Sequence, residues 1–215
     1  MQQQRARTEE AKEARRLALL DAALDEFFEK GFTAARMDDI AARAGLSKGT
    51  LYLYFESKED LFLSLVDAVA VPNVTQLEQV LSADLPFAEV LTNLMALAPH
   101  LIQTTRMPKL MKVVMADAHN FPDMVAAVRA QAPDKILALM SALLTRATER
   151  GEIELEDPDL TARLIVAPVV FSSIWKVTME DGDDTPVDVA ALLSLHAQMI
   201  TAALGATPKD PDHAQ

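Results

Sequence analysis

The chain has 215 residues, of which 50% are hydrophobic and 24% are charged, and its formal net charge at pH 7 is −12. These values predict a soluble globular protein of one or two domains with enough apolar residues to bury a core. The chain contains no cysteine, which excludes disulfides, thiol nucleophiles and cysteine-based metal sites. Its strongly negative net charge, taken alone, argues against nucleic-acid binding.

Residues 1–16 lack the apolar core of a secretory signal, so a cytoplasmic protein is expected. The most apolar stretch, residues 164–175, contains Pro168 and two serines. It is shorter than the ~20 residues that span a bilayer, so no membrane partner is expected.

Helix signals run along almost the whole chain, and no alternation of β-branched residues is evident, which predicts an all-α fold of about nine helices. The first helix is expected over residues 8–29, because Gly31 follows it in the usual position after a helix end. One face of this helix carries the apolar residues Leu17, Leu20, Leu24, Phe27 and Phe28.

Two short helices are expected next, over residues 37–44 and 48–55, and the tight turn between them contains Gly45. This pattern is typical of a helix-turn-helix. Ser47 is a good N-cap for the second helix, and a capping-box pattern at residues 57–60 opens a further helix.

Longer helices are expected after Pro72, over residues 74–82, 86–105, 108–119, 122–150, 158–180 and 186–204. Asp157 and Thr185 each precede a proline and can cap the helix that follows. Gly205 ends the last helix, and residues 207–215 are expected to form a disordered tail.

The second short helix is the candidate DNA-reading element. Leu51 and Phe55 are four positions apart and would anchor it to the core, which turns its remaining side chains outward. The outward residues are Lys48, Gly49, Thr50, Tyr52, Leu53 and Tyr54. Lysine and tyrosine hydroxyls can hold phosphates, hydroxyls and rings can touch base edges, and a glycine allows close approach to the DNA backbone.

At these positions the chain resembles the TetR/AcrR family of bacterial transcription regulators. The resemblance rests on four blocks that occur in order, at residues 27–32, 37–41, 44–52 and 54–61. It implies an N-terminal three-helix DNA-binding domain over residues 1–60 and a larger helical ligand-binding and dimerisation domain over residues 61–206.

The resemblance also implies residue roles. Lys48, Thr50, Tyr52 and Tyr54 match operator contacts of the family, and Lys58 matches a phosphate clamp. The chain departs from the family at the start of the second helix, where Ala35-Arg36 replaces the usual Thr or Ser pair. Arg36 could supply the missing phosphate contact by its charge.

The charge distribution agrees with a DNA-binding N-terminal part. Residues 1–60 hold 10 basic and 12 acidic side chains, whereas residues 61–215 hold 10 basic and 20 acidic ones. Basic residues exceed acidic ones in residues 1–16 and 43–58. Arg5 and Arg7, in the first of these stretches, could reach a minor groove, and simple solvation is an equal alternative.

The central helices contain candidate effector contacts. They are Phe87, Asn93, Met95, His100, Met111, Met115, Phe171 and Trp175. Flexible methionines suit an adaptable apolar pocket, but core contacts for the apolar residues and a solvated helix face for the polar ones explain the same pattern. No metal-ligand or cofactor motif is present.

The resemblance further implies a homodimer formed through the helices at about residues 158–180 and 186–204, which are too apolar for helices covered on one face only. We therefore expect a homodimeric repressor that a small, hydrophobic effector releases from palindromic double-stranded operator DNA. A transcriptional activator, or a DNA-binding protein without an effector, is the alternative. A helical enzyme that uses His100 or His119 is a remote alternative, since no nucleophile or metal motif accompanies them.

Overall fold

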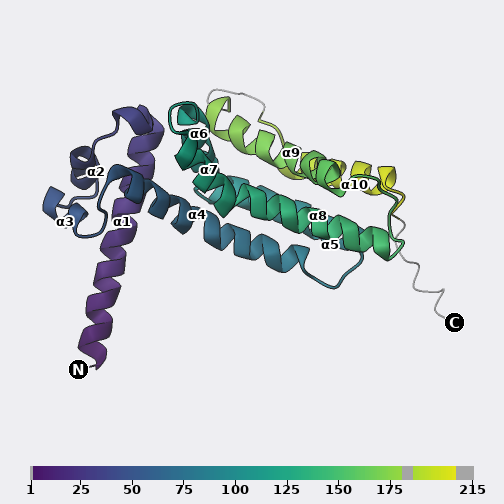
Figure 1. Cartoon of the computed structure of the whole chain (residues 1–215), viewed down its shortest axis with the longest axis horizontal. Helices are drawn as coiled ribbons and strands as arrows, with labels where there is room; N and C mark the ends of the chain where they lie inside the picture. The colour runs from purple at the N-terminus through teal and green to yellow at the C-terminus, as the bar shows by residue number, and fades with distance from the viewer. Residues whose placement is uncertain (1, 181–185, 207–215) are drawn as a thin grey trace. The chain divides into compact units, whose positions relative to one another are not determined.

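A computed structural model describes residues 2–180 and 186–206, with side chains from residue 9 onward. The expected tail, the expected cap Thr185 and the side chains of Arg5 and Arg7 lie outside the described residues. Every regular element in the described ranges is a helix, which confirms the all-α fold (Figure 1). The chain divides into two compact units, one of Met1–Val69 with Lys109–Val128 and one of Ala70–Pro108 with Arg129–Gln215.

The first unit is built around a cluster of aromatic rings. Its helices are α1 (Gln2–Ala34), α2 (Met37–Arg43), α3 (Lys48–Tyr52), the first part of α4 (Lys58–Leu81), α6 (Met107–Asp117) and most of α7 (Pro122–Gln131). The ring of Phe32 lies 5.3 Å from that of Phe27, 5.3 Å from that of Phe62 and 4.9 Å from that of Phe121, measured between centroids. Edge-to-face pairs at such distances are favourable, so the cluster joins α1, α4 and the segment between α6 and α7.

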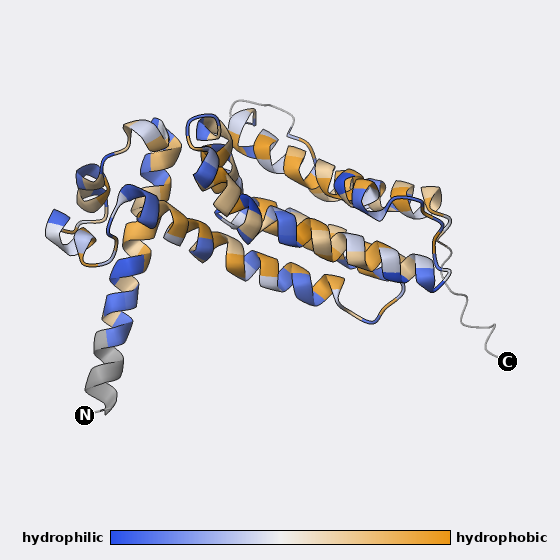
Figure 2. Ribbon diagram, viewed as in Figure 1, coloured by the Kyte–Doolittle hydropathy of each residue, from blue (hydrophilic) through white to orange (hydrophobic). Residues whose placement is uncertain are grey.

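The second unit is a bundle with an aliphatic core. Its helices are the later part of α4, α5 (Phe87–Thr104), α8 (Pro133–Glu149), α9 (Pro158–Thr178) and α10 (Val189–Ala203). Leu91, Met140, Leu144, Ile165 and Leu193 are fully buried in this core. Figure 2 shows that hydrophobic residues are spread along much of α9 and α10, which agrees with the expectation that one covered face cannot account for them.

Prolines explain two corrections to the expected helices. Pro72 lies inside α4, so the expected break near residue 72 does not occur. A proline inside a helix can produce a bend and not an end. By contrast, the expected single helix over residues 122–150 is two helices, because Ala132 adopts a non-helical conformation before Pro133 at the start of α8.

Three helix details also differ from expectation. The backbone of α1 is already helical at Gln2, earlier than the expected start at residue 8. Leu17 is exposed on α1, and the fully buried Leu19 lies in the core. Asp188 caps α10 by accepting the Ala191 N–H at 3.0 Å, so that helix begins three residues later than expected.

By length and composition alone, α9 is apolar enough to cross a membrane, which differs from the expectation based on residues 164–175. Only 22% of the apolar 18-residue stretch of α9 is buried. The side chains that it leaves exposed include Leu160, Leu164, Phe171 and Trp175. Exposed apolar patches of this kind are typical of interaction surfaces.

Candidate nucleic-acid interface

The two short helices form a helix-turn-helix as expected. Gly45 has φ +68° and makes the tight turn between α2 and α3, a backbone conformation that glycine adopts without strain. The N–H of Leu46 donates to the carbonyl of Ala41 at 2.9 Å and closes the turn. Ile40 and Leu51 are fully buried, so each helix is held to the core by one side and α3 presents its other side outward.

Ser47 caps α3, as the sequence predicts, and this cap also involves Thr50. The Ser47 Oγ accepts the Thr50 N–H at 3.1 Å and lies 2.8 Å from the Thr50 Oγ1. The Thr50 hydroxyl is therefore already part of the cap. Any contact that it makes with DNA has to share this hydrogen bond.

Gly49 and Leu53 lie on the outward side of α3. Leu53 is 83% exposed. A Cβ added at Gly49 would meet only the Ser47 Oγ, at 3.8 Å, and the φ of Gly49 is not in the left-handed region. No described part of the chain therefore requires a glycine here.

The two tyrosines of the interface differ in exposure. The ring of Tyr52 is exposed, whereas Tyr54 is half-buried with its ring 6.3 Å from that of Phe55. Arg36 is exposed at the N-cap position of α2, and its side chain makes no capping hydrogen bond there. Arg36, at the start of α2, and the exposed residues of α3 thus belong to the same helix-turn-helix.

Lys48 is paired within the helix-turn-helix. Its Nζ lies 2.7 Å from Oδ1 of Asp38 and donates to Oδ2 at 3.1 Å. The same Nζ lies 6.0 Å from the centroid of the Tyr52 ring. The hydrogen bond to Asp38 raises the pKa of Lys48, so this ammonium group remains charged while it is paired.

Lys58 lies in a different environment from the one that the resemblance implies. Its Nζ donates to the backbone carbonyls of Phe32 at 2.7 Å, Thr33 at 3.1 Å and Ala35 at 3.1 Å. It also lies 4.6 Å from the centroid of the Phe32 ring. Because an ammonium group has three donors, these bonds occupy Lys58 in closing the end of α1, and its assignment as a phosphate clamp has no support in this geometry.

Asp117 of α6 is a structural residue that the sequence reasoning missed. It is buried, and its carboxylate accepts the Phe32 N–H at 2.7 Å and the Thr33 hydroxyl at 3.2 Å. These bonds come directly after Gly31, whose φ of +78° kinks the backbone inside α1, so the helix expected to end near residue 29 continues to Ala34 after the kink. Asp117 lies more than 80 residues after Phe32 and Thr33 in the sequence, so no local sequence pattern could predict this contact.

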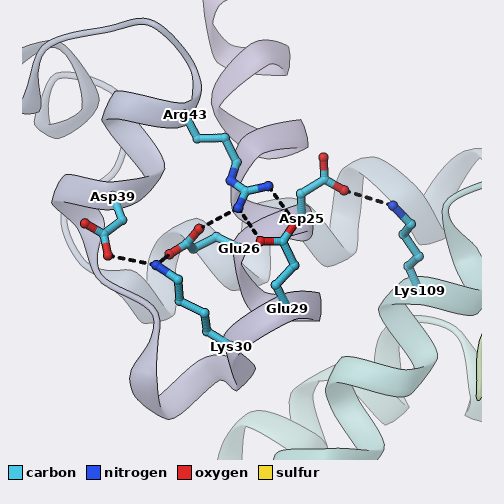
Figure 3. A network of polar contacts seen from close by, with 7 residues as sticks. All are labelled: Asp25, Glu26, Glu29, Lys30, Asp39, Arg43 and Lys109. Carbon is cyan, nitrogen blue, oxygen red and sulfur yellow. Dashed lines mark hydrogen bonds and ion pairs between the residues drawn. The ribbon is translucent and has the colours of Figure 1, made fainter.

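A second group of polar contacts joins α1 to α2 (Figure 3). Arg43 donates to both carboxylate oxygens of Glu29 and lies 3.1 Å from the buried carboxylate of Glu26. Lys30 pairs with Glu26 and, at 3.1 Å, with Asp39. The hydrogen bonds from Arg43 hold the pKa of Glu29 below its ordinary value.

The same face of α1 also binds α6. Lys109 lies 2.9 Å from Asp25, which Figure 3 shows beside the α2 contacts. The Lys109 and Lys112 Nζ atoms lie 5.3 and 4.1 Å from the centroid of the Phe28 ring. Charged side chains of α1 therefore contact both α2 and α6.

The eight expected effector contacts are not gathered in one cavity. Met95 is buried and lines a cavity of about 740 Å³ with α5 and α10 residues. Phe87 is a buried core residue on the edge of another cavity, and Asn93 is exposed on α5. His100 is exposed, and its Nε2 lies 3.2 Å from the Thr104 hydroxyl.

The remaining four residues lie elsewhere. Met111 and Met115 are on α6 in the first unit, and Met115 is exposed. Phe171 and Trp175 are adjacent on α9, with ring centroids 5.5 Å apart, and they line a small cavity of about 250 Å³. Within the described ranges, no group of three or more His, Asp or Glu residues is placed to hold a metal ion.

Two family descriptions match the chain. Residues 19–65 match "Bacterial regulatory proteins, tetR family", and residues 89–191 match "AefR-like transcriptional repressor, C-terminal domain". Over 199 residues the chain is 28% identical to the HTH-type transcriptional repressor BepR of Brucella suis, with 90% of this chain and 94% of BepR covered.

Solved structures share the fold. One is SmeT, the repressor of the Stenotrophomonas maltophilia multidrug efflux pump SmeDEF, with a TM-score of 0.68, 25% identity and coverage of 87% of this chain and 89% of SmeT. A complex of SmeT with triclosan gives a TM-score of 0.72 at 25% identity, with 88% and 91% covered. FadR of Bacillus subtilis in complex with stearoyl-CoA gives a TM-score of 0.69 at 20% identity, with 89% and 99% covered.

Proposed function

The chain belongs to the TetR family of bacterial regulatory proteins and is a DNA-binding transcription regulator, not an enzyme; on that premise we propose that it is a cytoplasmic, homodimeric repressor. A small, hydrophobic effector releases it from a palindromic operator. The proposed DNA-binding domain covers residues 1–60 and the proposed effector and dimerisation domain residues 61–206. The compact first unit adds residues 109–128 to the DNA-binding helices.

The observation that carries the DNA-binding role is the outward face of α3. Lys48, Gly49, Tyr52 and Leu53 are all exposed there, and Gly49 has no internal reason to lack a side chain. The ammonium group of Lys48 can bind phosphates or base-edge acceptors, and the side chains of Tyr52 and Leu53 can contact bases and thymine methyl groups in a major groove. Gly49 allows the helix backbone to approach the DNA closely. Arg36 and Tyr54 add phosphate contacts at the edge of this face.

The DNA-binding proposal is tested by selecting bound sequences from a random pool of double-stranded DNA. We expect a palindrome whose half-sites lie about one helical turn apart, because two copies of α3 read it. Tyr52→Ala should weaken binding to that palindrome, and Arg129→Ala, which removes an exposed cation from α7, is the control. Recovery of no enriched sequence would contradict the proposal.

The homodimer is supported by the exposed apolar side chains of α9 and α10. Phe171, Leu195 and Met199 are more than half exposed, and Leu192 and Trp175 are only partly covered. A second copy of the same surface would bury them by a symmetric contact. It would also hold two α3 helices at the fixed spacing that a palindrome requires.

An effector site is supported by the cavity between α5 and α10. Met95 and Pro99 line one side of it, and Ser194 and Gln198 line the other. A mainly apolar surface with a few polar groups is typical of small-molecule sites. The effector releases DNA only if it binds the two conformations of the protein with different affinities.

A thermal-shift screen with long-chain acyl-CoA and triclosan tests the effector proposal. These compounds are chosen because they are bound in the solved structures of FadR and SmeT. We expect one class to raise the melting temperature and to weaken operator binding, since a ligand that binds the folded state stabilises it. An effector-free regulator, which is the alternative, would show operator binding unchanged by every compound that stabilises it.

A further inference from the structure

Asp38 and Asp39 are adjacent residues in the first turn of α2, but they have different partners. Asp39 pairs with Lys30 of α1 at 3.1 Å, and this bond belongs to the network that joins α1 to α2. Asp38 pairs with Lys48 of α3 at 2.7 Å. Of the two carboxylates, therefore, Asp38 is the one that reaches the outward face of α3.

The Asp38–Lys48 pair is open to solvent and therefore to DNA. The Lys48 side chain is 59% exposed and the Asp38 side chain 46% exposed. Arg36, at the N-cap position of α2, is a second exposed cation and lies two residues before Asp38 in the chain. A carboxylate thus lies among the cations expected to meet phosphate.

A carboxylate in this position weakens attraction to arbitrary DNA. A free lysine gains affinity from any phosphate by releasing a condensed counterion. Lys48 is already neutralised by Asp38, so a phosphate has to compete with the carboxylate, and Asp38 itself repels the phosphate. This loss applies to every sequence, because phosphates carry no sequence information.

The same carboxylate holds Lys48 in one position. Its two oxygens engage at most two of the three ammonium donors, so at least one donor remains for DNA. A donor held in place favours an acceptor that lies at one particular position on the operator over acceptors that lie anywhere along the backbone.

We propose that Asp38 is a specificity-determining residue of the DNA-binding face, which suppresses binding of Lys48 to arbitrary phosphates and positions Lys48 for the operator. This inference rests on the proposed role of α3 in reading DNA. Asp38 acts through Lys48, so it is a positioning residue.

The test compares Asp38→Asn with Asp39→Asn in the full-length protein. Both variants remove one negative charge from the same turn, but only the first releases Lys48. Dissociation constants are measured over a salt series for the selected palindrome and for a scrambled duplex of the same length and composition.

For Asp38→Asn we expect binding to the scrambled duplex to tighten by about tenfold, and the slope of log Kd against log salt to steepen by about one, as for one additional phosphate contact. Binding to the palindrome should tighten less, so the ratio of the two affinities falls. Asp39→Asn should leave the ratio and the slope close to those of the wild type.

Two further variants separate the mechanism from a general charge effect. Asp38→Glu keeps a carboxylate and should retain most of the discrimination. In a Lys48→Gln background, Asp38→Asn should no longer steepen the salt dependence, because the lysine that it would release is absent. Equal effects of Asp38→Asn in both backgrounds would overturn the proposal.

The outcomes distinguish this inference from the proposed function. A wild-type protein that prefers no DNA sequence overturns the proposed function and this inference with it. A wild type that discriminates as expected, together with an unchanged ratio in Asp38→Asn, overturns the role of Asp38 alone.

Discussion

Lys58 is expected to stabilise the folded protein, because its ammonium group donates to three backbone carbonyls and lies against the ring of Phe32. Lys58→Met keeps the apolar stem and leaves the carbonyls of Phe32, Thr33 and Ala35 without this donor. We expect the free energy of unfolding to fall by about 1.5–3 kcal/mol, the usual loss for hydrogen bonds to a charged group. Urea denaturation measures it.

Lys48→Met is the matched control for Lys58→Met. It also removes an ammonium group, but one that pairs with an exposed carboxylate, and exposed ion pairs contribute about 1 kcal/mol or less. If Lys58→Met unfolded at the wild-type urea concentration but bound operator weakly, the clamp role implied by the family resemblance would be the better explanation.

Gly49 allows stability and DNA binding to be separated at one position. Gly49→Ala replaces a poor helix former with a good one, and the new methyl group meets no atom closer than 3.8 Å. We therefore expect the melting temperature to be unchanged or higher, while binding to the operator weakens by about tenfold, equivalent to ~1.4 kcal/mol. Calorimetry and fluorescence anisotropy with labelled DNA measure the two quantities.

Gly151→Ala should show the opposite behaviour. Gly151 has φ +67°, a conformation that alanine adopts only with strain, and it lies in the second unit, away from α3 in the sequence. We expect a lower melting temperature and unchanged operator affinity. A loss of stability in Gly49→Ala as large as in Gly151→Ala would show that Gly49 has a structural role.

At the scale of helices, the sequence predicted the caps better than the breaks. Ser47 and Asp157 were predictable because a cap depends on a side chain and a backbone N–H only three residues apart. Pro72 and Pro133 look alike in sequence, yet only Pro133 separates two helices. The difference depends on the contacts around each proline, which local sequence does not specify.

The same distinction applies to the proposed DNA-binding face. The exposure of Tyr52 and Leu53 follows from their spacing relative to the buried Leu51, so it could be predicted. The partners of Lys58 and Lys48 could not, because Phe32 and Asp38 come from other helices. Local spacing therefore predicts which side chains near α3 are exposed, but not which of them are already paired.

The contacts between α1 and α2 predict a dependence of stability on pH. The pKa of Glu29 is lowered in the folded protein by the hydrogen bonds from Arg43. Its contribution to stability is therefore fully present above the ordinary pKa of 4.5 and is lost as the pH falls through the lowered value. The melting temperature should decrease accordingly on acidification.

Glu29→Gln and Arg43→Gln test this dependence. Each removes one half of the pair, so each should melt below the wild type above about pH 5, by a difference that shrinks at lower pH. Melting curves between about pH 3 and pH 7 measure it. A difference that stays constant over this range would show that Glu29 stabilises the folded protein in another way.

For the whole molecule, the exposed apolar surface of α9 and α10 predicts that assembly and DNA binding are linked. Introducing Phe171→Asp together with Leu195→Asp places two charges on this surface. We expect a monomer that retains its helical content but binds the palindrome much more weakly, because only one half-site is held at a time. Light scattering after size-exclusion chromatography gives the mass.

Tyr52→Ala is the control for the assembly variant, since it should lose operator affinity and remain dimeric. A wild-type protein that is monomeric at micromolar concentration would contradict the dimer proposal. So would a double variant that keeps the dimer mass.

The whole chain has a net charge of −12, but residues 1–60, which contain the helix-turn-helix, are nearly neutral. The acidic excess falls mainly in residues 61–215, whereas Arg36 and Lys48 lie at the helix-turn-helix. An acidic remainder repels DNA outside this face and reduces non-specific adhesion. The local distribution of charge is therefore compatible with DNA binding, although the total charge alone argued against it.

Trp175 is the single tryptophan of the chain, and it is 38% exposed on α9 beside Phe171. Its indole ring is therefore an intrinsic fluorophore located on the apolar surface that a second copy would cover. The emission of Trp175 should shift to longer wavelength when the protein is diluted below the dissociation constant of the dimer, because the indole ring is then more exposed to solvent. The two tyrosines lie in or directly after α3, away from α9 in the sequence, so selective excitation of the indole reports on assembly without an added label.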